Sequence, residues 1–153
     1  MTSTPPLPSP QPVPESAWSP GPARLSRAAP TIAAAWYTLR GGDVSWPLEP
    51  CRYDLLVADR SGLRRVQVKS TTTREGNAWK VYVSTTSGGR RCYEAGEVDE
   101  FFIVDGDGAC FQIPVSAVDS KKALSLTAHE RYRVWHVPIE VACPPVDDLV
   151  RLR

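Results

Sequence analysis

Two short apolar runs separated by a tight turn constrain the fold of this chain more than any other feature. The first run is residues 54–57 (DLLV) and the second is residues 63–69 (LRRVQVK). Between them, residues 59–62 (DRSG) have the composition of a hairpin turn. Apolar runs of this length on either side of such a turn are typical of β-strands. The sequence therefore predicts a β-hairpin in the first half of the chain.

Three polar side chains accompany this hairpin. Residues two apart on a strand share a face, so Gln67 and Lys69 point the same way, and Asp54 stands on the neighbouring strand. Polar side chains on an inward face cost free energy unless they have partners or a function. A carboxylate, an amide oxygen and an ammonium brought together there can hold a divalent cation and a reacting phosphate, as in a nuclease. The alternative is structural: Asp54 caps a turn, or pairs with a nearby arginine or with Lys69.

The residues around these three follow a known pattern. Residues 52–57 (RYDLLV), residues 65–69 (RVQVK), and Tyr93 followed by residues 98–101 (VDEF) carry it. On these motifs, the segment from about residue 36 to residue 114 resembles the PD-(D/E)XK nuclease superfamily. The most similar subgroup carries Gln-x-Lys and includes intron-associated homing endonucleases and Holliday-junction-resolvase-like proteins. The resemblance implies a restriction-endonuclease-like core, DNA as substrate, and Mg²⁺ as cofactor with Mn²⁺ as a substitute.

The same resemblance implies a role for each residue of the site. Asp54, Gln67 and Lys69 would be catalytic, and the metal ligands would be Asp54, Gln67 and the Val68 carbonyl, with Glu49 as a further candidate. Gln67 replaces the acid that most of the superfamily carries, so we expect weaker metal binding than at a two-carboxylate site. Lys69 would stabilise the charge that builds on the phosphate, or orient and deprotonate the attacking water.

One departure from the superfamily favours a second interpretation. Relatives usually carry a glutamate on the first helix, but residues 25–35 contain no acid. Glu49 or Glu15 can compensate, the metal can bind weakly, or catalysis can be lost. The alternative function is therefore a catalytically degenerate nuclease fold that binds nucleic acid without cutting it.

Local patterns predict the remaining elements. A helix is expected over residues 23–40, interrupted by Pro30 and ended by Gly41 and Gly42. Further strands are expected at residues 79–84, 101–104, 110–113 and 132–138, a helical turn or short helix at residues 93–100, and a helix at residues 115–124. This order predicts an α/β fold, more closely α+β, in which helices flank a central mixed β-sheet.

Composition divides the chain into three parts. Eight of its 15 prolines fall within the first 22 residues, so residues 1–22 are expected to be a disordered arm. Residues 23–143 would form the nuclease domain, and residues 144–153 a C-terminal tail. We find neither a secretory signal nor an apolar run long enough to span a bilayer. The four cysteines contain no C-x-x-C pair, so reduced thiols and a cytoplasmic location are expected.

Charge is segregated along the chain although the net charge is only +1. Residues 52–91 contain nine Lys or Arg and three Asp or Glu, whereas residues 92–119 contain seven Asp or Glu and no Lys or Arg. One interpretation is a basic face for DNA, and the other is that the two segments pair in space. On the first interpretation, the phosphate contacts would come from Arg64, Arg65, Lys80, Arg90 and Arg91. The resemblance also implies a homodimer or higher homo-oligomer, since cutting two strands needs two sites.

Overall fold

A long amphipathic helix begins the described part of the protein. The structure is a computed structural model that describes residues 21–85, 91–94 and 96–137. Helix α1 (Pro22–Leu39) starts with a proline in its first turn, where the missing N–H costs no helical hydrogen bond. It buries one face, made of small residues and two aromatic rings: Leu25, Ala29, Ala33, Ala34, Trp36 and Tyr37. This face positions α1 against a β-sheet.

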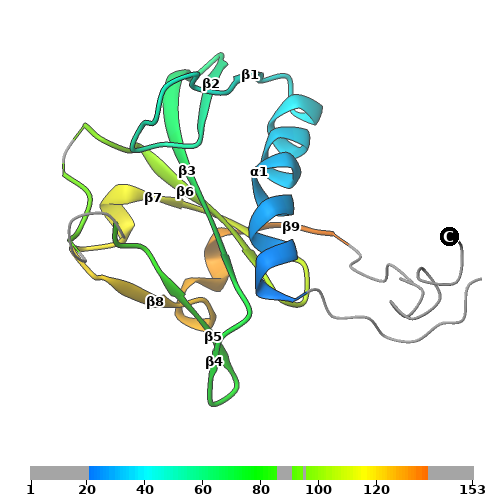
Figure 1. Cartoon of the computed structure of the whole chain (residues 1–153), viewed down its shortest axis with the longest axis vertical. Coiled ribbons are helices and arrows are strands. Elements are labelled where there is room, and N and C mark those ends of the chain that lie inside the picture. The colour runs from blue at the N-terminus through cyan, green and yellow to red at the C-terminus, as the bar shows by residue number, and fades with distance from the viewer. Residues whose placement is uncertain (1–20, 86–90, 95, 138–153) are drawn as a thin grey trace, which may run out of the picture.

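A six-stranded mixed sheet forms the centre of the molecule (Figure 1). Its strands, in spatial order, are β1 (Asp43–Ser45), β2 (Leu55–Asp59), β3 (Gly62–Thr71), β6 (Glu100–Asp105), β7 (Ala109–Pro114) and β9 (Arg133–His136). β3 and β6 run parallel, and the other neighbouring pairs run antiparallel. The predicted hairpin is present as β2 and β3, with Leu55 opposite Val66. Gly62, at φ 109°, supplies a turn conformation that other residues rarely adopt.

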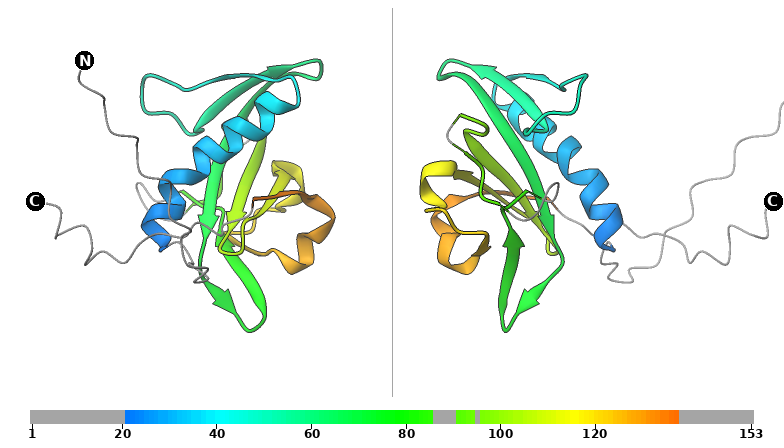
Figure 2. Two further views of the ribbon diagram at one scale, coloured as in Figure 1. Left: turned by 90° about the vertical axis from the view of Figure 1, so that its right-hand side faces the viewer. Right: turned by 60° about the vertical axis from the view of Figure 1, so that its left-hand side comes forward.

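A smaller sheet lies on the face of the central sheet opposite α1, so that the fold has three layers (Figure 2). It contains β4 (Arg74–Glu75), β5 (Ala78–Tyr82) and β8 (Ala123–Ser125). Two 3₁₀ helices flank β8 in the sequence, η1 (Val115–Ala117) before it and η2 (Thr127–Tyr132) after it. The confirmed fold class is α+β with a mixed sheet, consistent with a restriction-endonuclease-like core. One α-helix covers one face in the described residues, and strands and 3₁₀ turns cover the other.

Alternation along β3 assigns its residues to the two faces of the sheet. Val66 and Val68 belong to the apolar cluster that includes α1, Leu55, Val57 and Phe102. The second cluster, between the two sheets, contains Phe101, Ile103 and Phe111 with Val81, Val83 and Leu124. Because successive strand residues point to opposite faces, Gln67 and Lys69 lie on the side away from α1.

Two local predictions are wrong, and a third holds only as a turn. α1 continues through Pro30, because burial of the helix face on both sides of the proline offsets one lost backbone hydrogen bond. Residues 115–124 form η1 and then β8, since Asp119 (φ 49°) and Ser120 (φ 55°) adopt the left-handed conformation that ends a right-handed helix. The described part of residues 93–100 has a turn at Gly96 and Glu97 and no helix, and Glu100 already begins β6.

The predicted terminal segments are mostly outside the described residues. Residues 1–20 of the expected arm, and all of the expected tail, lie there. Pro22, assigned to the arm, is the first residue of α1. None of the helices in the described residues is long and apolar enough to cross a membrane.

Candidate active site

Asp54 and Gln67 face each other across the β2–β3 pair. Asp54 immediately precedes β2, and its backbone N–H donates to the Val66 carbonyl at 2.9 Å, which continues the register of the hairpin. The Asp54 carboxylate oxygen Oδ2 then accepts hydrogen bonds from Gln67 Nε2 and from the backbone N–H of Val68, the latter at 2.7 Å. The hairpin thus brings together two predicted site residues that are 13 positions apart.

These contacts gather oxygen atoms that suit a hard cation. Gln67 Nε2 also lies 3.3 Å from the Val68 carbonyl oxygen, so one amide nitrogen bridges that oxygen and the Asp54 carboxylate. Turning the amide over would present its oxygen to the same place. Carboxylate, amide and backbone carbonyl oxygens are the ligands that Mg²⁺ and related cations take in proteins. The residues therefore fit a Mg²⁺ ion, with Asp54 as the carboxylate.

The other candidate acids do not complete a group of three metal-binding side chains within the described residues. Glu49 is exposed in the bend that follows β1. α1 contains no acidic residue, and it packs on the opposite face of the sheet from Gln67. Within residues 21–85, 91–94 and 96–137, no three His, Cys, Asp or Glu side chains are grouped as a metal site would require. A cation at Asp54 would therefore be held with little negative charge.

Lys69 lies two residues beyond Gln67 on the same face. Burial lowers the pKa of Lys69, and the charge of Asp54 partly opposes this effect. Burial raises the pKa of Asp54, against the hydrogen bond from Val68, the charge of Lys69 and the hydrogen bond from Gln67. Among the described residues, the Lys69 ammonium makes no hydrogen bond and no ion pair within 4.0 Å. A direct Asp54–Lys69 ion pair, the structural alternative, is therefore not formed.

Tyr93 lies beside Lys69. The Lys69 ammonium nitrogen is 5.7 Å from the centre of the Tyr93 ring, and this ring meets Phe101 edge-on with centroids 5.4 Å apart. Burial, followed by the charge of Asp54, raises the pKa of Tyr93 to about 12, so its hydroxyl keeps its proton at neutral pH. The sequence placed Tyr93 in a segment that recurs in the resembling family, but it did not decide whether Tyr93 acts in the site or holds the fold.

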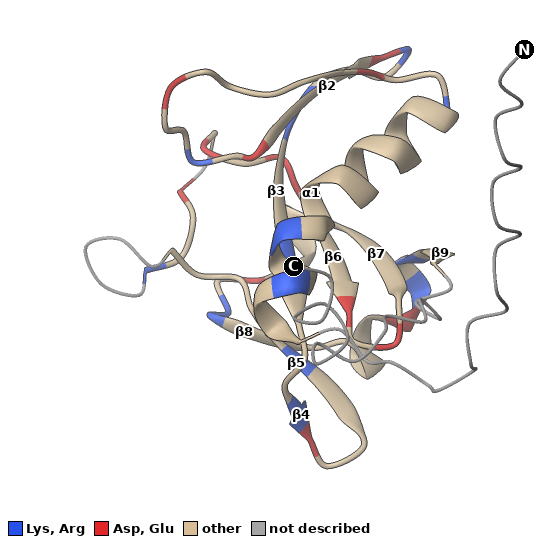
Figure 3. Cartoon of the chain, turned by 45° about the vertical axis from the view of Figure 1, so that its right-hand side comes forward, with Lys and Arg blue, Asp and Glu red and all other residues tan. Residues whose placement is uncertain are grey.

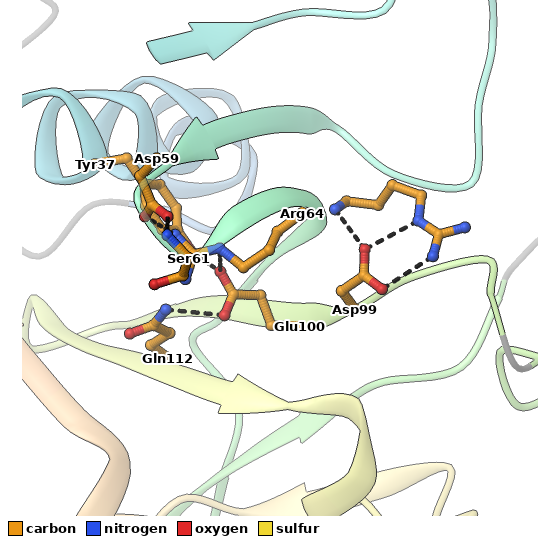
Figure 4. Close-up of polar contacts among 8 residues, drawn as sticks. Tyr37, Asp59, Ser61, Arg64, Asp99, Glu100 and Gln112 are labelled. Atoms are coloured by element: carbon orange, nitrogen blue, oxygen red, sulfur yellow. Dashed lines mark hydrogen bonds and ion pairs between the residues drawn. The ribbon is translucent and has the colours of Figure 1, made fainter. Parts of the chain in front are cut away.

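Glu100, which follows the motif acid Asp99, belongs to a separate buried cluster on the α1 side of the sheet (Figure 4). Its carboxylate accepts hydrogen bonds from the Tyr37 hydroxyl at 2.6 Å and from Gln112 Nε2 at 2.8 Å, and Arg64 Nε lies 3.7 Å away. Glu100 is 6% exposed, and its partners come from α1, β3 and β7. This cluster joins the helix to the sheet, and sequence patterns gave no sign of it.

The basic and acidic segments pair with each other. Figure 3 shows basic and acidic residues interspersed along the described fold. Five arginines from residues 52–91 contact acids from residues 92–119, in the pairs Arg52–Glu97, Arg64–Glu100, Arg65–Asp99, Arg74–Asp107 and Arg91–Glu97. Of the two interpretations of the charge pattern, pairing in space therefore describes these residues.

The five predicted DNA contacts are spread over different parts of the molecule. Arg64 lies on the α1 side, bonded to Asp59, and so away from the Asp54 face. Arg65 lies on the Asp54 face and Lys80 on β5, where Lys80 pairs with Glu75. Arg91 begins the segment that contains Tyr93. Arg90 lies outside the described residues.

The overall architecture resembles that of a solved nuclease. A bacterial homing endonuclease, I-Ssp6803I, matches with a TM-score of 0.54 and 22% sequence identity, over 65% of this chain and 70% of that chain. A similarity at this level of identity concerns the fold. The comparison with curated proteins gives no match.

The sequence itself assigns the family. Residues 27–137 match the family model described as PD-(D/E)XK endonuclease, and this span is most of the chain. The chain therefore belongs to the PD-(D/E)XK endonuclease family, as the motifs around Asp54, Gln67 and Lys69 predicted. Membership of the Gln-x-Lys subgroup stays a prediction.

Proposed function

We propose that this protein is a Mg²⁺-dependent DNA endonuclease that hydrolyses phosphodiester bonds at Asp54, Gln67 and Lys69. Family membership supports nuclease activity. One observation supports the assignment of this activity to Asp54, Gln67 and Lys69. The Asp54 carboxylate is bonded to Gln67, while the Lys69 ammonium, on the same face, has no ion-pair partner among the described residues. A purely structural lysine in such a place would be expected to hold its carboxylate directly.

The oxygen atoms of Asp54, Gln67 and Val68 would hold the metal ion. Mn²⁺ takes the same oxygen ligands and would substitute for Mg²⁺. When bound, the ion would polarise the scissile phosphate and lower the pKa of a water molecule. For Gln67 to ligate, its amide must turn over and give up its hydrogen bond to Asp54. Because the site brings a single carboxylate, we expect half-maximal activity at a higher Mg²⁺ concentration than a two-carboxylate site needs.

Lys69 would act on the phosphate and the attacking water. In-line attack of water on phosphorus breaks one P–O ester bond and adds negative charge to the phosphate oxygens. An ammonium that is already partly desolvated stabilises this charge more strongly than one in bulk water. With its pKa lowered by burial, Lys69 could also exchange a proton with the water.

DNA contacts would come from arginines beside the site that keep unused donors. Arg65 donates hydrogen bonds from Nε and Nη2 to the Asp99 carboxylate. Arg91 donates hydrogen bonds from Nη1 and Nη2 to the Glu97 carboxylate. A guanidinium has five N–H donors, so Nη1 of Arg65 and Nε of Arg91 can still reach phosphates. Lys80 and Arg90 stay candidates for more distant phosphates. Such contacts position DNA without reading its sequence.

A specific observation supports the second candidate function, a degenerate nuclease fold that binds nucleic acid without cutting it. α1 carries no acid, and in the part of the chain that the structure describes no three His, Cys, Asp or Glu side chains are grouped as a metal site would require. Loss of metal affinity would leave the arginines and the fold intact. This alternative predicts DNA binding that is the same with and without a divalent ion.

Incubation of supercoiled plasmid and branched DNA with the purified protein tests the proposal. Each substrate would be incubated with Mg²⁺, with Mn²⁺ and with EDTA, for the natural protein and for Lys69→Ala. We expect nicking with either ion, none with EDTA, and none by the variant, which should still bind DNA. Nicking by Lys69→Ala at the natural rate would rule out the site, and binding without nicking under every condition would favour the degenerate module.

The assembly and the compartment belong to the same proposal. Two copies would place two sites on the two strands, and the surface next to the edge strand β1 carries the exposed apolar side chains Trp46 and Leu48. Sedimentation of the purified protein would measure the number of subunits. The proposed compartment is the cytoplasm, where the thiols of Cys51, Cys92 and Cys110 would stay reduced.

A further inference from the structure

The Tyr93 ring lies beside the Lys69 ammonium. Its centre is 5.7 Å from Lys69 Nζ, within the range at which a cation is attracted to the face of an aromatic ring. Lys69 has no hydrogen bond or ion pair among the described residues, so the ring contact is available to orient its ammonium. The contact is therefore of a different kind from ordinary core packing.

The position of Tyr93 is fixed from both ends of its segment. On one side Arg91 donates two hydrogen bonds to the Glu97 carboxylate, at 2.9 and 2.6 Å, and that carboxylate accepts a third from the Glu94 backbone N–H at 2.7 Å. On the other side Asp99 accepts hydrogen bonds from Arg65 Nε and Nη2, both at 2.9 Å. The Arg91–Glu97 contact therefore joins the two ends of the segment, and the Arg65–Asp99 contact ties the residues that follow it to β3.

The Tyr93 ring also packs against the buried side chain of Phe101. Phe101 meets Tyr93 edge-on at 5.4 Å, and Phe101 pairs directly with Gln67 across the parallel strands β3 and β6. Through Phe101, the Tyr93 ring is therefore positioned next to Gln67, the residue that contacts Asp54. The second apolar cluster already has Phe101, Val83 and Val98 as fully buried members, whereas Tyr93 stays partly exposed.

We propose that Tyr93 is a positioning residue, whose ring holds the Lys69 ammonium over the Asp54–Gln67 pair. This inference rests on the proposed nuclease function for its effect on rate, but not for the contact itself. The ring restricts the four-carbon side chain of Lys69 to a small part of its conformational range before substrate binds. Preorganising a charged group in this way lowers the free energy needed to bring it to the reacting phosphate.

Two variants of Tyr93 separate the ring from the hydroxyl group. Tyr93→Phe keeps the ring, so we expect single-turnover cleavage within about twofold of the natural rate. Tyr93→Leu keeps an apolar side chain without the aromatic face, and cleavage should slow by roughly 3- to 30-fold, the range of a single cation–aromatic contact. DNA affinity and melting temperature should change little in either variant. In a Lys69→Ala background, Tyr93→Leu should cause no further loss.

Nuclear magnetic resonance measures the contact without cleavage, metal or DNA. The Lys69 methylene protons, identified by their absence in Lys69→Arg, should be displaced upfield by the ring current of Tyr93. The displacement should persist in Tyr93→Phe and disappear in Tyr93→Leu. Ordinary lysine shifts in the natural protein would overturn the inference, even if the protein cleaves DNA. If the shifts behave as expected, the positioning holds even if the protein does not cleave. Equal cleavage by Tyr93→Leu and the natural protein would overturn the effect on rate.

Discussion

The Gln67 side-chain amide donates to the Asp54 carboxylate, and the same amide nitrogen lies 3.3 Å from the Val68 carbonyl oxygen. Gln67 Nε2 therefore lies between two oxygen atoms that, in the proposed function, would be ligands of a bound cation. Each of the predictions below about metal depends on this relationship.

Replacing Gln67 by glutamate should lower the stability of the protein in the absence of metal and raise its affinity for Mg²⁺. The new carboxylate would face Asp54 and the Val68 carbonyl with no donor, so we expect the free energy of unfolding in EDTA to fall by about 1–3 kcal/mol. A second negative charge should tighten Mg²⁺ binding by about tenfold or more. Calorimetric titration with Mg²⁺ and urea unfolding would measure both. The control Asn77→Asp adds a charge in the exposed β4–β5 turn and should change neither.

Asp54→Asn should separate metal binding from stability. Burial raises the pKa of Asp54, so keeping this side chain charged at neutral pH costs free energy in the folded protein. Both hydrogen bonds go to the same Asp54 oxygen, so the asparagine oxygen in its place can still accept from the Val68 N–H and from Gln67 Nε2. We expect the unfolding free energy in EDTA to stay within about 0.5 kcal/mol or rise, while the Mg²⁺-dependent rise in melting temperature disappears. A large loss of stability in EDTA would mean that Asp54 is mainly structural.

Tyr37→Phe should weaken the fold without altering the chemistry. The Tyr37 hydroxyl donates to the buried Glu100 carboxylate at 2.6 Å, so its removal leaves that carboxylate short of a donor. We expect a loss of about 1–3 kcal/mol in urea unfolding. The cleavage rate of the folded variant should be natural. Tyr132→Phe, which removes an exposed contact with Arg131, should cost much less, and equal costs would contradict the buried role of Tyr37.

Protonation of Glu97 should lower the stability of the protein in acid. Hydrogen bonds from Arg91 and from the Glu94 N–H lower the pKa of Glu97 from 4.5 to about 2. A carboxyl group whose pKa is depressed by folding stabilises the protein above its unfolded pKa, and this contribution is lost as the pH falls toward 2. Between pH 5 and pH 3, urea unfolding of Glu97→Gln should therefore depend less steeply on pH than that of the natural protein. Parallel dependences would show that the Arg91–Glu97 contact is absent in solution.

The fold was predictable where side-chain pattern and turn chemistry agree. The β2–β3 hairpin followed from an apolar run on each side of Gly62, and the strand face shared by Gln67 and Lys69 followed from a period of two. The pairing of Asp54 with Gln67 needed the register as well, and a hairpin with a fixed turn supplies it. These are local relationships, which one stretch of sequence contains.

What could not be predicted depends on contacts between distant segments. Pro30 was expected to break a helix, but its cost is offset by packing against strands far along the chain. The positive φ of Asp119 and Ser120 has no clear sequence signal, so a helix was expected where β8 forms. Arg64 and Arg65 are adjacent, yet the pleat of β3 sends one to Glu100 and the other to Asp99.

The most direct test of the central claim is single-turnover cleavage of a defined DNA duplex in Mg²⁺ by four proteins: the natural protein, Asp54→Asn, Lys69→Met and Lys122→Met. Lys122 is an exposed lysine that serves as a matched control. We predict cleavage at the natural rate by Lys122→Met, a loss of roughly a hundredfold or more in each site variant, and retained DNA binding in all four. Natural rates in Asp54→Asn or Lys69→Met would contradict the account.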